Sequence, residues 1–510
     1  MENSRTRNSV YNMVSSVGIK ILTLLLSFAS RTIFIYVLGA VYLGLQGLFS
    51  NILSFLALSE LGIGAAISFL LYKPLAINDI ERIKTVMQFY KKCYIVVGLV
   101  ILALGCFLMP FLKYLVNIDQ PIPENIYLIF FLYVLNSAVS YFFVAYKQTL
   151  IEANQKKYLL TRIEVFFTIL NCIVDIIVLL IFRDFISFLL FKLLLVVVRN
   201  IVIANKIDKL YPYLREPVSK KLTKLEVHKV FKDIYSVSVF RLGSVLFNSV
   251  TNIVTSAIIG TIIVGYYSNY TLIVTQIEAV FMMAAAAVSA GIGNVVATES
   301  KERQFQVYKK LSLLMFFFYG TCTICMNQLL NSFMNLWLGS NNSSYILSQF
   351  VVVLICANFY INCSCQILEK FRIASGLFKT GRDLQVIGGI ANIGLSVWLA
   401  KIYGFEGALI SPFICKLCIT VTPFVLLVGK QAFNKSVDYM LREYFTQIIV
   451  TVTIGAIVYA FCYRIHMGDI YQFLLEFSAS LLIILLGFYL LYKHTTEFQE
   501  IKVKYIKRKL

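Results

Sequence analysis

The chain has 510 residues, of which 59% are hydrophobic and only 14% are charged, and its mean hydropathy is +0.79. Soluble domains carry about 25% charged residues, so this composition excludes an ordinary soluble globule and indicates a polytopic membrane protein. The net charge of +20 would favour nucleic-acid binding in a soluble protein, but in a membrane protein it first predicts basic cytoplasmic loops.

Fourteen apolar runs succeed one another along the chain, and each is long enough to cross the hydrocarbon core of a membrane as a helix. The fold is therefore predicted to be all-α and polytopic, with about fourteen transmembrane helices and both termini on one side. The predicted spans are 15–38, 43–71, 93–113, 125–146, 159–182, 185–203, 235–259, 265–297, 311–336, 345–368, 384–402, 407–428, 445–464 and 470–492.

The basic residues predict which side the termini occupy. Of the 46 Lys and Arg residues, 35 lie in the two tails and in the loops after even-numbered spans, whereas four lie in the opposite loops. Because cytoplasmic loops carry the excess of Lys and Arg, both termini are predicted to be cytoplasmic. This distribution explains most of the positive charge without nucleic acid.

The eleven cysteines fall almost entirely within apolar runs, as small packing residues in reduced form do. Two pairs, Cys322 with Cys325 and Cys415 with Cys418, have a spacing that metal sites use. No set of four cysteines, or of two cysteines and two histidines, has zinc-site spacing, so no metal site is predicted.

An internal repeat is evident at an offset of 221 residues, and it matches charges and glycines inside the spans. The pairs include Lys20 with Arg241, Gly39 with Gly260, and Gly44 with Gly265. Six spans separate the two copies, so the repeat predicts two six-helix bundles related by a pseudo-two-fold axis along the membrane normal. The predicted segments are an N-terminal lobe (1–215), a basic cytoplasmic linker (216–234), a C-terminal lobe (235–430), two additional spans (431–492) and a basic cytoplasmic tail (493–510).

Charged side chains lie deep inside the apolar runs, where each costs about 2.5–3.5 kcal/mol if it faces lipid. They are therefore predicted to line a watery cavity or to pair with one another. Lys20 and Arg31 are eleven residues apart and share one helix face, with Ser27 between them. The corresponding stripe on the seventh span consists of Arg241, Asn248 and Asn252.

The charges inside the spans are unequal in number. The bases are Lys20, Arg31, Lys192, Arg241 and Lys416, and the acids are Glu60, Asp175 and Glu278. This excess of bases predicts a cationic central cavity that binds an anionic guest. The alternative is that the bases pair with acids of neighbouring spans and only join the helices. The three acids are candidates for pairing or for carrying a coupling ion.

Two stretches resemble a known family. The segment RTIFIYVLGAVYLGLQGLFSNILSFLALSELGIGAAI (31–67) resembles the first two helices of bacterial polysaccharide-repeat flippases of the Wzx type. The segment IASGLFKTGRDLQVIGGIANIGLSVWLAKIYGFEGALI (373–410) resembles the loop between their tenth and eleventh helices, together with the stretch after that loop. These flippases belong to the multidrug/oligosaccharidyl-lipid/polysaccharide (MOP) exporter superfamily. The family often has an acid where Val41 stands, so this chain departs from the family pattern by lacking a charge at that position.

The resemblance implies transport of an undecaprenyl-pyrophosphate-linked oligosaccharide from the inner to the outer leaflet of the bacterial plasma membrane. The product would be a capsule, an O-antigen or an exopolysaccharide. Lys20, Arg31 and Arg241 occupy places where the family uses basic cavity residues. The implied partners are this lipid-linked substrate, membrane lipids and polysaccharide assembly proteins such as a polymerase. No cofactor is expected, and coupling to H⁺ or Na⁺ is not assigned.

Other functions stay open. A lipid II flippase fits the same features, whereas a cation-coupled exporter of cationic drugs would favour an acidic cavity. A membrane polysaccharide polymerase fits less well, because the predicted outer loops are short and almost uncharged. A structural membrane protein would not need matched bases inside its spans. No Walker A sequence occurs, and no soluble segment is large enough for an active site, so neither ATP hydrolysis nor another enzyme activity is predicted.

Overall fold

The computed structural model describes residues 22–60, 63–117, 121–154, 156, 158–218, 222–339, 343–377, 379–435, 437–463 and 469–506. These residues form helices, turns and short connections, and none of them lies in a strand. The prediction of an all-α polytopic fold is confirmed. The chain divides into two compact units, Met1–Gly265 and Tyr266–Leu510. The segment boundaries predicted from the sequence were placed by the internal repeat, whereas these two units are defined by which residues pack together. The predicted boundaries therefore stay predictions.

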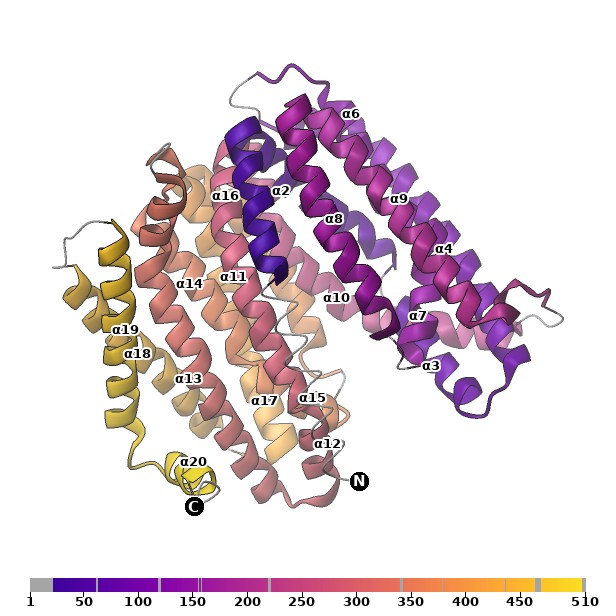
Figure 1. The fold of residues 1–510 in the computed structure, drawn as a ribbon. Helices are drawn as coiled ribbons and strands as arrows, with labels where there is room; N and C mark the ends of the chain where they lie inside the picture. Colours follow the sequence, from indigo (N-terminus) through magenta and orange to yellow (C-terminus); the bar gives the residue numbers. More distant parts are fainter. Residues whose placement is uncertain are drawn as a thin grey trace. The chain divides into compact units, whose positions relative to one another are not determined.

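The first unit is a bundle of long helices (Figure 1). Helix α4 packs on α6, α6 on α9, and α8 on α9, while α10 packs on α2. The elements are the helix Leu22–Leu38, α2 (Ala40–Leu56), η1 (Ala57–Glu60), α3 (Ile63–Ala76), α4 (Ile80–Leu108), η2 (Met109–Phe111), α5 (Leu112–Leu115), α6 (Ile126–Phe143), α7 (Ala145–Ala153), α8 (Tyr158–Phe182), α9 (Phe185–Leu210), η3 (Pro212–Arg215) and α10 (Lys224–Ile258).

The second unit is built around α13, which packs against α14, α18 and α19. Its last two long helices, α18 and α19, also pack on each other. The elements are α11, which begins in the first unit (Thr261–Ala287), α12 (Ser289–Thr298), α13 (Lys301–Met334), η4 (Asn335–Gly339), η5 (Ser343–Tyr345), α14 (Gln349–Ser364), α15 (Gln366–Ala374), α16 (Arg382–Ile414), the π-helix η6 (Cys415–Val421), α17 (Thr422–Phe433), α18 (Val437–Cys462), α19 (Asp469–Tyr492) and α20 (Thr496–Ile506).

The helices agree with the predicted spans. Among the described residues, ten helical runs are long and apolar enough to cross a membrane, and three shorter apolar helices lie at Leu22–Leu38, Ala40–Leu56 and Val245–Ile258. One of the ten, Arg382–Phe433, contains two predicted spans, because the chain bends at Gly404, where φ is +63°. Counted in this way, the helices account for all fourteen predicted spans.

The glycines matched by the repeat have matching structural roles. Gly39 ends the helix Leu22–Leu38 with a φ of +86°, and Gly260 separates α10 from α11 with a φ of +145°. A residue with a Cβ is strained in this region of backbone conformation, so glycine is the natural choice at both breaks. The repeat thus reproduces the same helix break in both copies.

A second glycine pair brings α2 and the first turn of α11 into contact. A Cβ added to Gly44 would lie 2.8 Å from the carbonyl carbon of Thr261 and closer still to its oxygen. A Cβ added to Gly265 would meet the carbonyl of Ala40 in the same way. The two helices therefore touch through small residues, as membrane helices do when their backbones approach closely.

Candidate functional site

Three of the five predicted cavity cations, Lys20, Arg31 and Arg241, belong to the first helices of the two repeat copies. Lys20 falls outside the described residues. Arg241 lies on α10, and its side chain is outside the described set as well. Arg31 is half-buried on the helix Leu22–Leu38, and its guanidinium lies near the Tyr133 side chain of α6. The predicted cavity between the lobes stays a prediction.

A polar network inside the first unit includes Lys192 and Asp175. Asp175, on α8, accepts a hydrogen bond from the Ser30 hydroxyl over 3.4 Å. Lys192, on α9, interacts electrostatically with this carboxylate, and its Nζ lies 5.1 Å from the centre of the Phe188 ring. The network joins the first helix to α8 and α9.

A comparable network inside the second unit includes Lys416 and Glu278. Lys416 Nζ, in the π-helix η6, donates to Asn362 Oδ1 over 2.8 Å. Glu278, on α11, lies near Asn362 and interacts electrostatically with Lys416. Since the wider turn of a π-helix often marks a functional position, its occurrence at Lys416 draws attention to this network.

The two lysines occupy equivalent places in the repeat, within FKL (191–193) and CKL (415–417). Each lysine interacts electrostatically with an acid of its own unit. The role of these two lysines as cavity cations stays a prediction.

Glu60 lies in a cluster of tyrosines in the first unit. Its carboxylate accepts hydrogen bonds from the hydroxyls of Tyr94 (2.6 Å) and Tyr141 (2.7 Å). Tyr90 donates to the Tyr94 hydroxyl over 2.8 Å and is 2.9 Å from the Thr149 hydroxyl. These polar groups thus form a chain from Glu60 to α7. The two tyrosine hydrogen bonds tie Glu60 to α4 and α6.

The three predicted polar residues of the cavity have different surroundings. Ser27 donates to the Thr23 carbonyl of its own helix over 2.7 Å. Asn248 is exposed on α10, whereas the side-chain oxygen of Asn252 is buried and has no hydrogen-bond partner among the described residues. Asn252 is therefore the one of the three that most needs a further donor.

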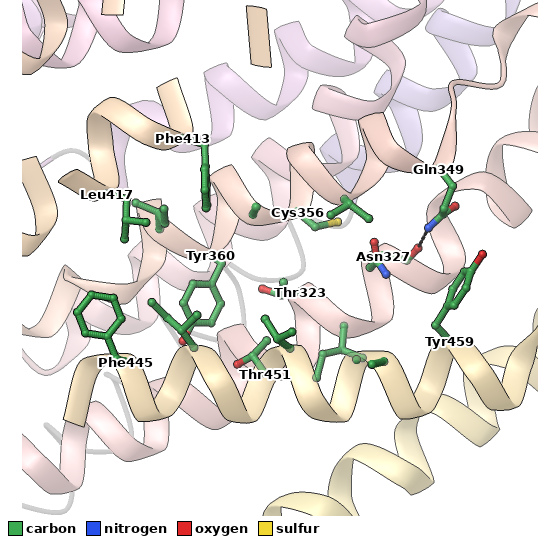
Figure 2. A pocket seen from close by; sticks show the side chains of 18 residues that line it. Thr323, Asn327, Gln349, Cys356, Tyr360, Phe413, Leu417, Phe445, Thr451 and Tyr459 are labelled. Atoms are coloured by element: carbon green, nitrogen blue, oxygen red, sulfur yellow. Dashed lines mark hydrogen bonds between the residues drawn. The ribbon is translucent and has the colours of Figure 1, made fainter. Parts of the chain in front are cut away.

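An apolar groove, with a volume of about 470 Å³, lies inside the second unit. It runs between α18 on one side and α13, α14 and the end of α16 on the other. Figure 2 shows Phe445, Thr451 and Tyr459 of α18 facing Tyr360 and Cys356 of α14 across it. Residues 445 and 459 are separated by about 21 Å along the helix axis, so the groove is long and narrow.

One end of the groove is polar. Gln349 donates to the Asn327 carbonyl over 2.8 Å, and the side-chain oxygen of Asn327 is buried without a hydrogen-bond partner in the described part of the chain. The groove thus combines a hydrocarbon-like body with a few polar groups at one end, as pockets for amphiphilic ligands do.

Two acids in the additional helices were not predicted as site residues. Glu476 of α19 is 3% exposed and accepts hydrogen bonds from Ser332 (2.7 Å) and Gln472 (2.9 Å). Glu443 of α18 lies just before the predicted span 445–464, where the sequence suggests only a loop end. The sequence does indicate a polar site at Glu443. Thr446 and Gln447 follow it at spacings of three and four, so the three side chains share one helix face.

Comparison with known proteins gives structural relatives but no sequence relatives. No family model and no curated protein sequence matches the chain. A structure of the lipid II flippase MurJ, in an inward closed conformation, is 13% identical, with a TM-score of 0.66, and covers 94% of this chain and 99% of its own. An inward-facing multidrug resistance MATE family transporter of the MOP superfamily is 14% identical, with a TM-score of 0.60, and covers 83% and 98%. A point mutant of the Vibrio cholerae MATE transporter VcmN is 14% identical, with a TM-score of 0.58, and covers 86% and 99%.

The chain has the fold of the MOP-superfamily transporters. Both kinds of neighbour are matched over nearly their full length, so the likeness extends beyond one bundle. The flippase covers more of this chain than either MATE structure does. At 13–14% identity the likeness concerns the fold, and the substrate has to be argued from the residues.

Proposed function

We propose that the protein moves an undecaprenyl-pyrophosphate-linked oligosaccharide repeat unit from the inner to the outer leaflet, by alternating access. The observation that carries the proposal is the apolar groove along α18. A lipid-linked sugar has a head that must avoid hydrocarbon and a long tail that must avoid water. A transporter for it needs separate polar and apolar surfaces, and the groove supplies the apolar one.

The dimensions of the groove support a chain-like ligand. Its length of about 21 Å is two-thirds of the roughly 30 Å hydrocarbon core. Its lining includes several exposed apolar side chains, among them Val353, Phe445 and Val452, so a chain can enter from the side. Each buried CH₂ group contributes about 0.8 kcal/mol, so burying several isoprenoid carbons would hold the tail firmly while the head crosses.

The head would be bound by the bases of the two repeated first helices. Lys20, Arg31 and Arg241 are the residues proposed to bind the pyrophosphate, with Asn252 as a further polar group. Guanidinium groups suit phosphate oxygens, because they bind them through two parallel hydrogen bonds. Glu60, Asp175 and Glu278 are proposed as the groups that respond to H⁺ or Na⁺ during turnover.

The proposed setting is the bacterial plasma membrane, with both termini in the cytoplasm, as the distribution of basic loops favours. The proposed partners are the lipid-linked substrate, membrane lipids and polysaccharide assembly proteins such as a polymerase. Transport would serve the synthesis of a capsule, an O-antigen or an exopolysaccharide, without ATP hydrolysis and without enzyme activity.

A second candidate is the flipping of lipid II, and the likeness to the MurJ structure favours it. Both substrates carry a polyprenyl pyrophosphate, so the groove and the cations do not separate them. A strain lacking the protein separates them, because the trapped lipid-linked intermediate identifies the substrate. Accumulation of lipid II itself, with other lipid-linked glycans at normal levels, would favour the second candidate.

The groove is tested with the purified protein in proteoliposomes that contain a fluorescent lipid-linked oligosaccharide. Ala456 lines the groove on α18, and a phenylalanine there would project into it. Ala456→Phe is expected to lower the flipping rate at least about tenfold, since it blocks the path of the tail. The matched control is Ile457→Phe, since Ile457 is the adjacent residue, is 53% exposed and does not line the groove. Equal rates for the two variants would contradict a role for the groove.

A further inference from the structure

A second pocket, polar and with a volume of about 260 Å³, lies at the end of the second unit where α13 begins and α19 ends. Its walls come from α13, from the first turns of α18, and from the turn between α19 and α20. It is distinct from the apolar groove, with which it shares no lining residue. Its charged side chains are Lys309, Arg442, Glu443 and Glu497.

The charges of this pocket are incompletely matched. Lys309 forms an ion pair with Glu497, which fastens the start of α20 to α13. One carboxylate oxygen of Glu443 is buried and has no hydrogen-bond partner among the residues described. Arg442 is exposed and forms no ion pair within the described part of the chain. A buried carboxylate oxygen without a donor is costly, so the pocket as built lacks a donor at Glu443 and an anion at Arg442.

The pocket lies where helices meet the membrane surface. Two tyrosines in its lining, Tyr439 and Tyr492, are at the ends of the candidate spans Tyr439–Cys462 and Ile470–Tyr492. Tyrosine is enriched at the depth of the lipid headgroups, because its ring is apolar and its hydroxyl is polar. The distribution of basic loops predicts that this end of the bundle faces the cytoplasmic leaflet.

We propose that this pocket binds the headgroup of a phospholipid that carries both a phosphate and a primary ammonium, such as phosphatidylethanolamine. Arg442 binds the phosphate, and the Glu443 carboxylate accepts a hydrogen bond from the ammonium. Thr446 and Gln447, which come next on the same face of α18, supply further polar groups beside them.

The charge balance of the pocket favours a zwitterion over an anion. Two bases and two acids line it, so a ligand with one charge of each sign leaves the site neutral. A purely anionic headgroup would add net negative charge near Glu443 and Glu497 and bring no positive charge to balance it. A choline headgroup keeps the same charges as an ethanolamine, but its quaternary nitrogen has no N–H to donate.

Native mass spectrometry of the purified full chain tests this proposal, with dioleoylphosphatidylethanolamine and dioleoylphosphatidylcholine added separately. The wild-type protein is expected to retain the ethanolamine lipid about tenfold better, because a hydrogen bond to a charged group is worth roughly that factor. The N,N-dimethylated ethanolamine lipid, which keeps one N–H, is expected to lie between the two. This series needs no variant, so it is independent of any folding defect.

Two variants assign the contacts. Glu443→Gln is expected to remove the preference for ethanolamine over choline, whereas Arg442→Gln is expected to weaken both lipids equally. Glu500→Gln is the matched control. Glu500 of α20 pairs with Lys310 of α13, the same two helices that Lys309 and Glu497 join, and it does not line the pocket. Equal retention of the two lipids by the wild-type protein, or an unchanged preference in Glu443→Gln, would overturn the proposal. A wild-type protein that prefers the ethanolamine lipid but does not flip the lipid-linked oligosaccharide would contradict the proposed function and leave the headgroup site supported.

Discussion

The contact between α2 and α11 makes a sharp prediction about Gly44. Replacing Gly44 with Ala adds one methyl group, and that methyl would lie 2.8 Å from both the carbonyl carbon and the Cγ2 of Thr261. Ordinary contacts of a Cβ begin near 3.4 Å, so the two helices must move apart by about half an ångström or more. The obstacle is backbone, which cannot change rotamer to make room.

The expected cost is about 1–3 kcal/mol, the usual range when a methyl is forced into a packed interface. Gly265→Ala should cost a similar amount, since its Cβ meets the Ala40 carbonyl at the same crossing. The double variant should cost less than the sum of the two, because the separation that admits the first methyl also makes room for the second.

The measurement is thermal unfolding of the purified protein in detergent, monitored by the loss of the monodisperse peak. Gly394→Ala is the matched control, because Gly394 lies within α16 and an added Cβ there meets nothing within 4 Å. We expect that variant to keep or raise the melting temperature, since alanine is the better helix former. Equal melting temperatures for Gly44→Ala and Gly394→Ala would refute the reasoning.

The polar networks lead to four further predictions. Glu278→Gln should slow flipping in proteoliposomes more than it weakens substrate binding, and equal losses would remove Glu278 as a coupling residue. Lys416→Met should lower the melting temperature more than the double variant with Glu278→Gln, because the single change leaves the half-buried Glu278 carboxylate without its neighbouring positive charge. Glu60→Gln should cost about 1–3 kcal/mol of stability, measured by thermal unfolding, because an amide replaces one acceptor of a tyrosine hydroxyl with a donor. Arg31→Ala and Arg241→Ala should abolish surface glycan while the protein stays in the membrane, and surface glycan retained in both would contradict the cationic cavity.

The number and order of the helices could be predicted because hydrophobic length alone decides them. A helix in lipid must satisfy its own backbone groups, so each apolar run of sufficient length becomes one span. The glycine breaks were predictable for a related reason. Gly39 and Gly260 stand in the sequence as one pair of the repeat, and both have positive φ values in the structure. Local backbone chemistry can be inferred from one sequence when the same pattern occurs in it twice.

The partners of the charged residues could not be predicted, because they depend on which helices become neighbours. Pairing with a base was one expectation for Glu60, but its carboxylate accepts from Tyr94 and Tyr141, which lie on α4 and α6. The positions of Tyr94 and Tyr141 in the sequence do not show that both hydroxyls donate to the same carboxylate. Glu443 was missed for another reason. It lies at a span boundary, where acids are commonly exposed, and the sequence alone does not distinguish a buried acid from an exposed one there.

The two copies of the repeat keep a lysine but supply its acid from different helices. Asp175 lies on α8, and its counterpart at the offset of 221 is Ser396; Glu278 lies on α11, and its counterpart is Ala57. A lysine in a span requires a compensating charge, and each unit provides one in its own way. Lys192 and Lys416 thus each have an acidic neighbour within their own unit. The bases proposed to bind an anionic substrate are those of the repeated first helices, which is why Arg31→Ala and Arg241→Ala test the transport mechanism more directly than substitution of either lysine.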